Sequence, residues 1–113
     1  MSDCLFCKII AGTIPAKLVH QDDRAVAFRD INPQAPTHIL IVPREHIASI
    51  NDVGDEHAAT VGHLHIVAKN LARSEQLTDG YRLVFNTGVN AGQTVHHIHL
   101  HLLGGRPLGW PPG

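Results

Sequence analysis

The pattern of apolar positions predicts one long helix in the middle of the chain. Between residues 55 and 74, apolar side chains recur at the intervals that one face of an α-helix requires. Asp55 precedes them and can cap the first turn. We therefore expect a helix from Asp55 to about Ser74, with these apolar positions on one face: Ala58, Val61, Leu64, Ala68, Leu71 and Ala72.

A second, shorter helix is predicted near the N-terminus. Residues Cys4–Ala11 are mostly apolar, and Gly12 follows them directly. Glycine is a common residue just past the end of a helix, because it adopts the left-handed conformation without steric cost. We expect the helix to stop at this position.

Short segments of strand character, separated by turn residues, surround the long helix. The clearest is rich in β-branched residues and ends at Pro43. The polar segment Asp22–Arg24 separates the first two and predicts a tight hairpin. The predicted strands are Leu18–Gln21, Ala25–Arg29, Thr37–Val42, Tyr81–Asn86 and Val95–Leu103.

The remaining segments are predicted to be irregular. A glycine-containing loop, Thr87–Thr94, joins the last two strands, and residues 104–113 carry four glycines and three prolines. Strands joined by short turns, with one long helix inserted, indicate an α+β fold on an antiparallel sheet.

Composition limits the class of protein. A chain of 113 residues with 43% hydrophobic content is expected to form one domain, residues 1–113, with residues 104–113 as its tail. A net charge of −1 gives no electrostatic reason to expect a nucleic-acid or membrane partner. The N-terminus has no basic segment leading into an apolar one, and no apolar stretch reaches the roughly 20 residues that cross a bilayer. We therefore expect a cytoplasmic protein.

Histidine is the residue in excess, with ten in the chain. His97, His99 and His101 alternate with apolar residues, so on a strand they share one face while the apolar residues face the core. Three adjacent cations would repel one another near neutral pH. We therefore expect their pKa values to be pushed apart, as occurs mainly at functional sites.

Two kinds of chemistry use such a row of imidazoles. The rings can bind a catalytic metal that keeps an open position for water, or one ring can attack phosphorus while its neighbours orient it. The spacing alone does not separate the two. The preceding segment, Asn86–Thr94, offers backbone N–H groups, amides and a hydroxyl, which suit a phosphate and favour the second.

Three motifs of this sequence resemble those of the histidine triad (HIT) family and occur in the same order along the chain. Gly92–Leu103 resembles the family signature, in which histidines are separated by single apolar residues, and Asp30–His38 is similar to its ribose-binding segment. The ending, Gly104–Arg106 followed by Trp110–Gly113, is similar to the tail of the Hint branch. The resemblance implies an antiparallel sheet that dimerisation extends.

The resemblance also implies catalytic roles. His99 would attack the α-phosphate and form a nucleotidyl-histidine that water then hydrolyses. His97 and a backbone carbonyl would fix the tautomer of His99, while His101 and His38 would flank the phosphate. Thr94 stands where Hint proteins commonly carry serine and would lie near the leaving group.

The nucleotide-binding residues follow from the same resemblance. Asp30 would accept hydrogen bonds from the ribose hydroxyls, and Gln93 and Asn86 would contact the phosphate and sugar. In a homodimer, Trp110 would touch the substrate bound by the partner protomer. An apolar slot for a purine base would be formed by Leu5, Phe6, Ile9, Phe28, Ile31 and Leu40.

Cys4 and Cys7 form a second candidate site. In a reducing compartment, a pair at this spacing points to metal binding or redox chemistry before it points to a disulfide. The resemblance implies a structural Zn²⁺ held by Cys4, Cys7, His46 and His97, with no cofactor required for catalysis. The alternative is two buried free cysteines on one face of a short helix.

These observations predict a dimeric nucleotide hydrolase of the Hint type. It would cleave the P–N bond of purine nucleoside 5′-phosphoramidates and release the nucleoside monophosphate. One alternative is a dinucleoside polyphosphate hydrolase, against which the Trp-Pro-Pro-Gly ending argues. The others are a non-catalytic nucleotide-binding or scaffold protein and a metal-dependent hydrolase with His97, His99 and His101 as zinc ligands.

Overall fold

The computed structural model describes residues 3–113, so the first two residues of the predicted domain lie outside it. The chain forms a sheet of five strands, two α-helices and three short 3₁₀ turns within those residues. The 3₁₀ turns are Ile50–Asp52, Asp55–His57 and Val89–Ala91. The helices and strands, in chain order, are α1 (Leu5–Ala11), β1 (Leu18–Gln21), β2 (Ala25–Arg29), β3 (Thr37–Pro43), α2 (Ala58–Ser74), β4 (Tyr81–Val84) and β5 (Leu100–Gly104).

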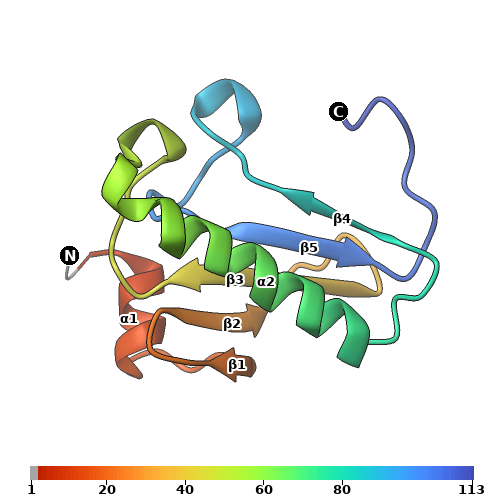
Figure 1. Ribbon diagram of the computed structural model, residues 1–113, viewed down its shortest axis with the longest axis horizontal. Coiled ribbons are helices and arrows are strands. Elements are labelled where there is room, and N and C mark those ends of the chain that lie inside the picture. Colours follow the sequence, from red (N-terminus) through yellow and green to blue (C-terminus); the bar gives the residue numbers. More distant parts are fainter. Residues whose placement is uncertain (1–2) are drawn as a thin grey trace.

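The strands form one antiparallel sheet in the order β1-β2-β3-β5-β4 (Figure 1). The predicted α+β class is confirmed, and so is the hairpin, because β1 and β2 pair with each other across the Asp22–Arg24 turn. The strand β5 comes last in the sequence but inserts between β3 and β4. This insertion places the histidine-rich segment beside the central strand of the sheet.

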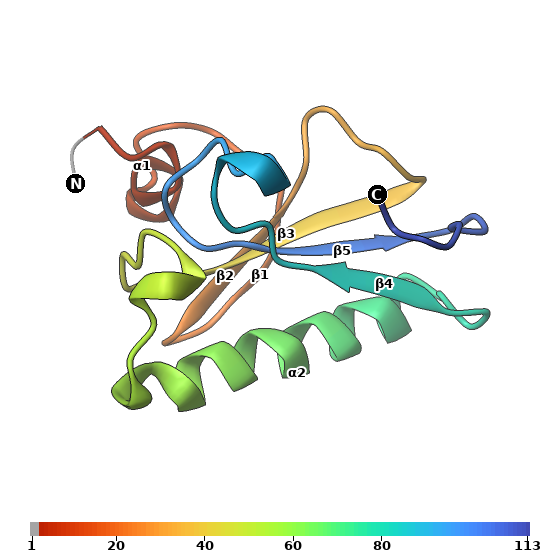
Figure 2. The ribbon, with the colours of Figure 1, turned by 90° about the horizontal axis from the view of Figure 1, so that it is seen from above.

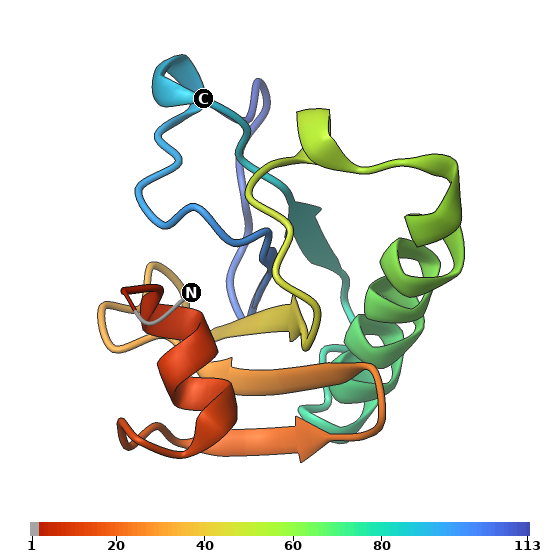
Figure 3. The ribbon, with the colours of Figure 1, turned by 90° about the vertical axis from the view of Figure 1, so that its left-hand side faces the viewer.

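The two faces of the sheet are covered differently. Helix α2 lies along one face, whereas α1 lies across the other, as the view from above shows (Figure 2). The side view places α1 beside β1 and β2, with α2 on the far side of the sheet (Figure 3). The main core lies under α2 and includes Leu64, Ile39, Ile41 and Leu102, all fully buried.

A smaller core lies under α1. The Phe6 ring of α1 meets the Phe28 ring of β2 edge-on, with 5.3 Å between the ring centres. Val26, Leu40 and Val42 complete this cluster from the same face of the sheet. Helix α1 stops at Gly12, which has the left-handed φ of +80° that the sequence predicts. Phe6 thus anchors the short helix to the sheet together with a few aliphatic contacts.

The long helix begins later than predicted. Asp55 does not cap it, because residues Asp55–His57 form a separate 3₁₀ turn and α2 starts at Ala58. Neither the 3₁₀ turn nor α2 begins with a side-chain cap. Instead, the N–H of Gly54 donates to Nδ1 of His57 at 2.9 Å. The His57 ring thus accepts from the backbone N–H that precedes the turn, which is a different donor from those that an Asp55 cap would satisfy.

The last strand is shorter than predicted. It begins at Leu100 rather than Val95, and its pairing with β3 ends at Ile41. Pro43 lies two residues beyond Ile41 on β3 and has no N–H to donate. Its carbonyl accepts from the His97 ring at 2.8 Å. The predicted strand Tyr81–Asn86 is also too long. The observed strand, β4, pairs only with β5 and ends at Val84.

The tail contains no helix or strand after Gly104, as predicted. Arg106 attaches it by donating to the Gln34 carbonyl at 2.9 Å, and Arg82 donates to the Gly109 carbonyl at 2.7 Å. Among residues 3–113, neither helix has both the length and the apolar character that a membrane-spanning segment needs.

The two faces of α2 predict different responses to truncation. Leu64 is fully buried against the sheet, so Leu64→Ala should lower the free energy of unfolding by about 2 to 5 kcal/mol. Ile66 on the same helix is 52% exposed, so Ile66→Ala should cost less than about 1 kcal/mol. Urea unfolding followed by circular dichroism measures both. Equal losses for the two variants would contradict this packing.

Candidate active site

The candidate site lies where the start of β5 passes β3 on the face that carries α1. His101 is paired with Leu40, and His38 with Leu103, so the two histidines are diagonal neighbours on adjacent strands. Nε2 of His38 lies 2.9 Å from Nδ1 of His101. His99 continues the row, with its ring centre 4.9 Å from that of His101.

His97 is fully buried and is turned away from this row. Its Nε2–H donates to the carbonyl of Pro43 at 2.8 Å, so the lone pair is on Nδ1. That Nδ1 faces Cys4 and His46, at 3.4 and 3.2 Å. His97 and His99 both lie against Phe6 of α1, with ring centres 6.0 and 5.0 Å from that of Phe6, although both residues precede the strand.

His99 is oriented by the backbone of its neighbour. Its Nδ1–H donates to the carbonyl oxygen of His97 at 2.8 Å. A neutral imidazole has one N–H, so Nε2 of His99 carries a lone pair. The ring is 8% exposed and lies edge-on to Phe6, with 5.0 Å between the ring centres. The arrangement leaves a single nitrogen of His99 able to act as a nucleophile.

A chain of hydrogen bonds sets the tautomers of the other two histidines. The N–H of Gln34 donates to Nδ1 of His38 at 3.0 Å, so the proton of His38 is on Nε2. The Nε2–H of His38 donates to Nδ1 of His101, so the proton of His101 must be on its Nε2. Nε2 of His101 is buried and has no hydrogen-bond partner among the described residues. It is an unsatisfied donor.

Burial keeps these imidazoles neutral. It lowers the pKa of His38, His97 and His99, and it lowers the pKa of His101 from 6.5 to about 4, helped by the nearby His99 and His38. Burial lowers all four pKa values, and neighbouring imidazoles lower the pKa of His97 and of His101 further. Repulsion between neighbours is avoided because none of them is charged at neutral pH.

A cavity of about 300 Å³ adjoins His99 and His101. Its lining contains all six apolar residues predicted to hold the base, together with Asp30 and Thr94. Ile31 is 99% exposed, so it forms an outer edge of the cavity. Residues that the sequence did not predict here come mainly from the segment between α1 and β1 and carry no chemical motif: Ile14, Pro15, Ala16, Arg29 and Val95.

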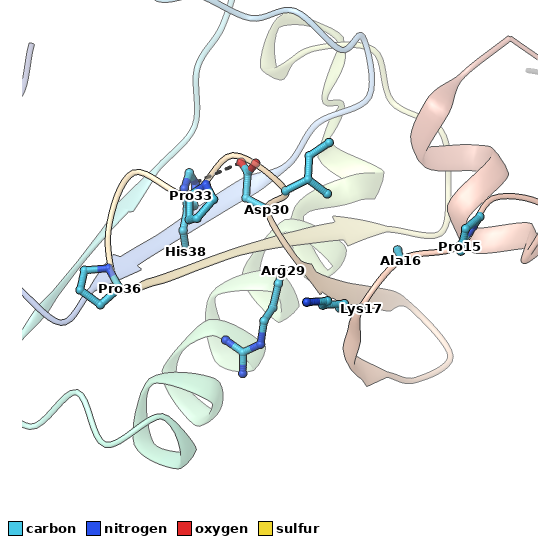
Figure 4. A pocket seen from close by; sticks show the side chains of 9 residues that line it. Pro15, Ala16, Lys17, Arg29, Asp30, Pro33, Pro36 and His38 are labelled. Atoms are coloured by element: carbon cyan, nitrogen blue, oxygen red, sulfur yellow. Dashed lines mark ion pairs between the residues drawn. The ribbon is translucent and has the colours of Figure 1, made fainter.

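A second cavity, of about 660 Å³, lies beside the first and shares Arg29, Asp30 and Ile31 with it. Figure 4 shows its lining, with Lys17 next to Arg29 and with an ion pair drawn between His38 and Asp30. His38 lines this second cavity and not the first. His38 therefore lies behind His101 as seen from the first cavity.

The structure does not bring every predicted residue to the cavity. Asn86 is absent from its lining, and Trp110 is 85% exposed within the tail. Gln93 is buried, but its amide is used elsewhere. It donates to the carbonyls of Ala48 and Val95 at 2.8 and 3.1 Å, and it accepts from the Gly88 N–H at 3.1 Å.

Four predicted metal ligands meet between α1 and the end of β3. The ligand atoms of Cys4, Cys7, His46 and His97 all lie within 4.8 Å of one another. Cys7 Sγ is 3.3 Å from His46 Nδ1 and 3.6 Å from His97 Nδ1. Ligands around tetrahedral zinc are separated by about 3.3 to 3.8 Å, given ordinary Zn–N and Zn–S bond lengths. The donor set and its spacing therefore fit Zn²⁺.

A second group, Asp30, His38 and His101, is equally close together. It does not suit a metal, because Nδ1 of His38 accepts from the Gln34 N–H and its Nε2 therefore holds the proton. A metal on Nε2 would need that proton to move to Nδ1, against another N–H. This group is a set of hydrogen-bonding residues.

Two histidines outside the cavity share one carboxylate. His20 and His63 both contact Oδ2 of Asp22, at 2.6 and 2.8 Å, which ties the β1–β2 turn to α2. Burial alone would raise the pKa of Asp22, but the hydrogen bonds from these rings and from the Arg24 and Ala25 N–H groups hold it well below its usual range. The sequence assigned no role to either histidine.

The lowered pKa of His101 predicts how stability depends on pH. Between about pH 6.5 and 4 the unfolded chain binds a proton at this residue and the folded chain does not, so acid favours unfolding. His101→Asn keeps an acceptor for His38 and removes the titration. On going from pH 7 to 5, the wild type should lose about 1 to 2 kcal/mol more free energy of unfolding than the variant.

Urea unfolding at the two pH values gives this difference. Both proteins keep the four Cys and His residues near α1, so any acid effect at that cluster cancels. Identical pH dependence in the two proteins would show that His101 is not held neutral by the fold.

Known proteins match this chain over most of its length. A family model described as "Scavenger mRNA decapping enzyme C-term binding" matches residues 3–107. The purine nucleoside phosphoramidase of Escherichia coli K12 is 54% identical over 108 residues, covering 95% of this chain and 91% of the relative.

Solved structures match equally well. The crystal structure of a HIT family hydrolase from Legionella pneumophila superposes with a TM-score of 0.96 at 58% identity, covering 98% of this chain and 100% of that chain. A Zn-bound histidine triad family protein from Mycobacterium smegmatis gives a TM-score of 0.83 at 34% identity, covering 93% and 76%.

Proposed function

The chain belongs to the histidine triad (HIT) family, and we propose that it is a hydrolase of purine nucleoside 5′-phosphoramidates. It cleaves the P–N bond and releases the nucleoside monophosphate. The observation that carries this proposal is the tautomer of His99, whose Nδ1–H is held by the His97 carbonyl while Nε2 is free. The Escherichia coli phosphoramidase, 54% identical, supports the choice of substrate.

The reaction proceeds in two displacements. Nε2 of His99 forms a bond to the α-phosphorus as the P–N bond of the substrate breaks, and the amine leaves with a proton taken from solvent. The ring is now positively charged, and the His97 carbonyl that accepts from Nδ1 stabilises it. Water then attacks the phosphorus and gives up a proton to solvent, the bond to His99 breaks, and the monophosphate is released with Nε2 again unprotonated.

The neighbouring groups complete the phosphate site. The buried Nε2–H of His101 lacks an acceptor within residues 3–113 and donates to a non-bridging phosphate oxygen. His38 holds the His101 ring in place from behind, and Thr94, exposed on the cavity wall, donates to the leaving group. Because Gln93 is fully hydrogen-bonded to backbone, we assign it to holding the loop and not to direct contact with phosphate.

The apolar lining favours a purine base. Phe6, Phe28 and Leu40 offer area for contact and no hydrogen-bonding groups, so adenine and guanine are accepted alike. Asp30 lines the same cavity and accepts from the ribose hydroxyls. The homodimer stays a prediction, supported by the 85% exposure of Trp110, which would reach the partner protomer's cavity. The cytoplasmic location also stays a prediction.

The Cys4, Cys7, His46 and His97 cluster holds a structural zinc in this proposal, supported by the Zn-bound relative from Mycobacterium smegmatis. When bound, the metal ties the N-terminal segment to the sheet and adds folding free energy without taking part in the reaction. Nδ1 of His97 belongs to this cluster, while the His97 carbonyl orients His99. No cofactor is required for catalysis.

Removal of the nucleophile should abolish turnover. His99→Gly leaves no group able to form the covalent intermediate, so hydrolysis of adenosine 5′-phosphoramidate should fall by at least about a thousandfold. Single-turnover quenching followed by mass spectrometry should find AMP attached to His99 in the wild type. His65→Ala, an exposed position on α2, is the matched control and should keep full activity.

Full turnover in His99→Gly, with no adduct on the wild type, would refute the mechanism. Diadenosine polyphosphate assayed in parallel decides between the two hydrolase branches, because a higher kcat/KM for that substrate favours the alternative. Nucleotide binding without turnover of either substrate favours a binding or scaffold protein.

Chelation separates a structural zinc from a catalytic one. Treatment with 1,10-phenanthroline should lower the melting temperature by several degrees, because the metal binds only the folded chain. Turnover measured well below that temperature should stay within about twofold of its original value. A metal-dependent hydrolase predicts loss of turnover that added zinc restores. Cys4→Ser should reproduce the effect of the chelator on stability.

A further inference from the structure

The proton on Nε2 of His38 has two acceptors within reach. Nδ1 of His101 lies at 2.9 Å and Oδ2 of Asp30 at 3.4 Å. His38 has no second N–H to offer, because its Nδ1 already accepts from Gln34. The carboxylate is held in this orientation, since its other oxygen accepts from the Asn32 N–H at 2.8 Å. Asp30 is thus close enough to compete with His101 for this hydrogen bond, which in this structure is made to His101.

We propose that Asp30 is a positioning residue that couples recognition of the ribose to the phosphate site through His38 and His101. Ribose hydroxyls that donate to Asp30 satisfy its carboxylate, which then no longer draws the His38 N–H. The His38–His101 bond strengthens, and the His101 ring is fixed with Nε2–H toward the α-phosphate. This inference rests on the proposed function, because it assumes a nucleotide with its ribose at Asp30.

The strength of the competition follows from charge and burial. A carboxylate is a stronger acceptor than a neutral imidazole, so it draws on the His38 N–H despite the longer distance. The side chains of His38 and Asp30 are only 4% and 19% exposed, so water does little to weaken that attraction. A ribose diol offers O–H donors in place of the N–H. Binding of the ribose thus removes Asp30 as a competing acceptor for the His38 N–H.

The His101 donor makes the coupling matter for catalysis. Its Nε2–H is buried without an acceptor among residues 3–113, so it gains a partner only when a phosphate oxygen arrives. A ring that is loosely held from behind aims this donor poorly at the transition state. Loss of the ribose hydroxyls should therefore lower kcat, in addition to weakening binding.

Paired substrates and variants test this coupling. The two substrates are adenosine 5′-phosphoramidate and its 2′,3′-dideoxy analogue, assayed with wild type and with Asp30→Asn. Asparagine can still accept from the Asn32 N–H, and its NH₂ group cannot accept from His38. Asp23→Asn, in the exposed β1–β2 turn, is the matched control for loss of one carboxylate.

The wild type and Asp23→Asn should lose about tenfold in kcat on the dideoxy substrate. Asp30→Asn should have equal kcat on both substrates to within about twofold, and its kcat on the dideoxy substrate should exceed that of the wild type. An effect of the hydroxyls on KM alone would overturn the proposal. An equal loss of kcat in wild type and Asp30→Asn would overturn it as well.

A binding measurement that needs no turnover tests the inference independently of the proposed function. In ¹⁵N NMR of the histidine rings, AMP and 2′,3′-dideoxy-AMP should shift Nδ1 of His101 differently in the wild type and alike in Asp30→Asn. Absence of phosphoramidate hydrolysis would refute the proposed function, and this comparison would still decide the coupling. Identical shifts with the two nucleotides in the wild type would overturn it.

Discussion

The buried peptide and ring of His97 connect the two functional parts of this molecule. The Nε2–H of the ring donates to the Pro43 carbonyl at the end of β3, which directs Nδ1 toward the cysteines of α1. The carbonyl of the same residue accepts from Nδ1 of His99 and leaves that ring one free nitrogen. The Cys4, Cys7 and His46 cluster and the proposed nucleophile His99 are therefore oriented by the ring and the carbonyl of one residue. A displacement of His97 disturbs both.

The site works with neutral imidazoles whose protons are assigned by backbone groups. The Gln34 N–H determines the tautomer of His38, which determines that of His101, and the His97 carbonyl determines that of His99. Burial lowers the pKa of each ring, so the protons stay where these contacts put them at neutral pH. The tautomers of His38, His99 and His101 are thus set by folding, before any substrate binds.

Much of the scaffold could be predicted from periodicity and turn chemistry. The bounds of β1 and β2 follow from two short segments of strand character on either side of a polar turn, and the stop of α1 follows from Gly12. The apolar lining of the cavity could be named because the resemblance to a family supplied it. These features depend on local sequence preference or on the resemblance to the family.

The features that could not be predicted from the sequence depend on contacts between distant segments. The start of β5 is set by Pro43 on β3, and the direction of the His97 ring is set by the same carbonyl 54 residues away. Gln93 was expected at the phosphate, but Ala48 and Gly88 use its amide. No local pattern in the sequence encodes which backbone carbonyl a histidine will meet.

Neutron diffraction from a crystal at neutral pH tests the central claim directly, because it locates the hydrogens of the imidazole rings. The account predicts a hydrogen on Nδ1 of His99 and none on its Nε2, with hydrogens on Nε2 of His38 and of His101. A hydrogen on Nε2 of His99, or on both nitrogens of His101, would contradict it.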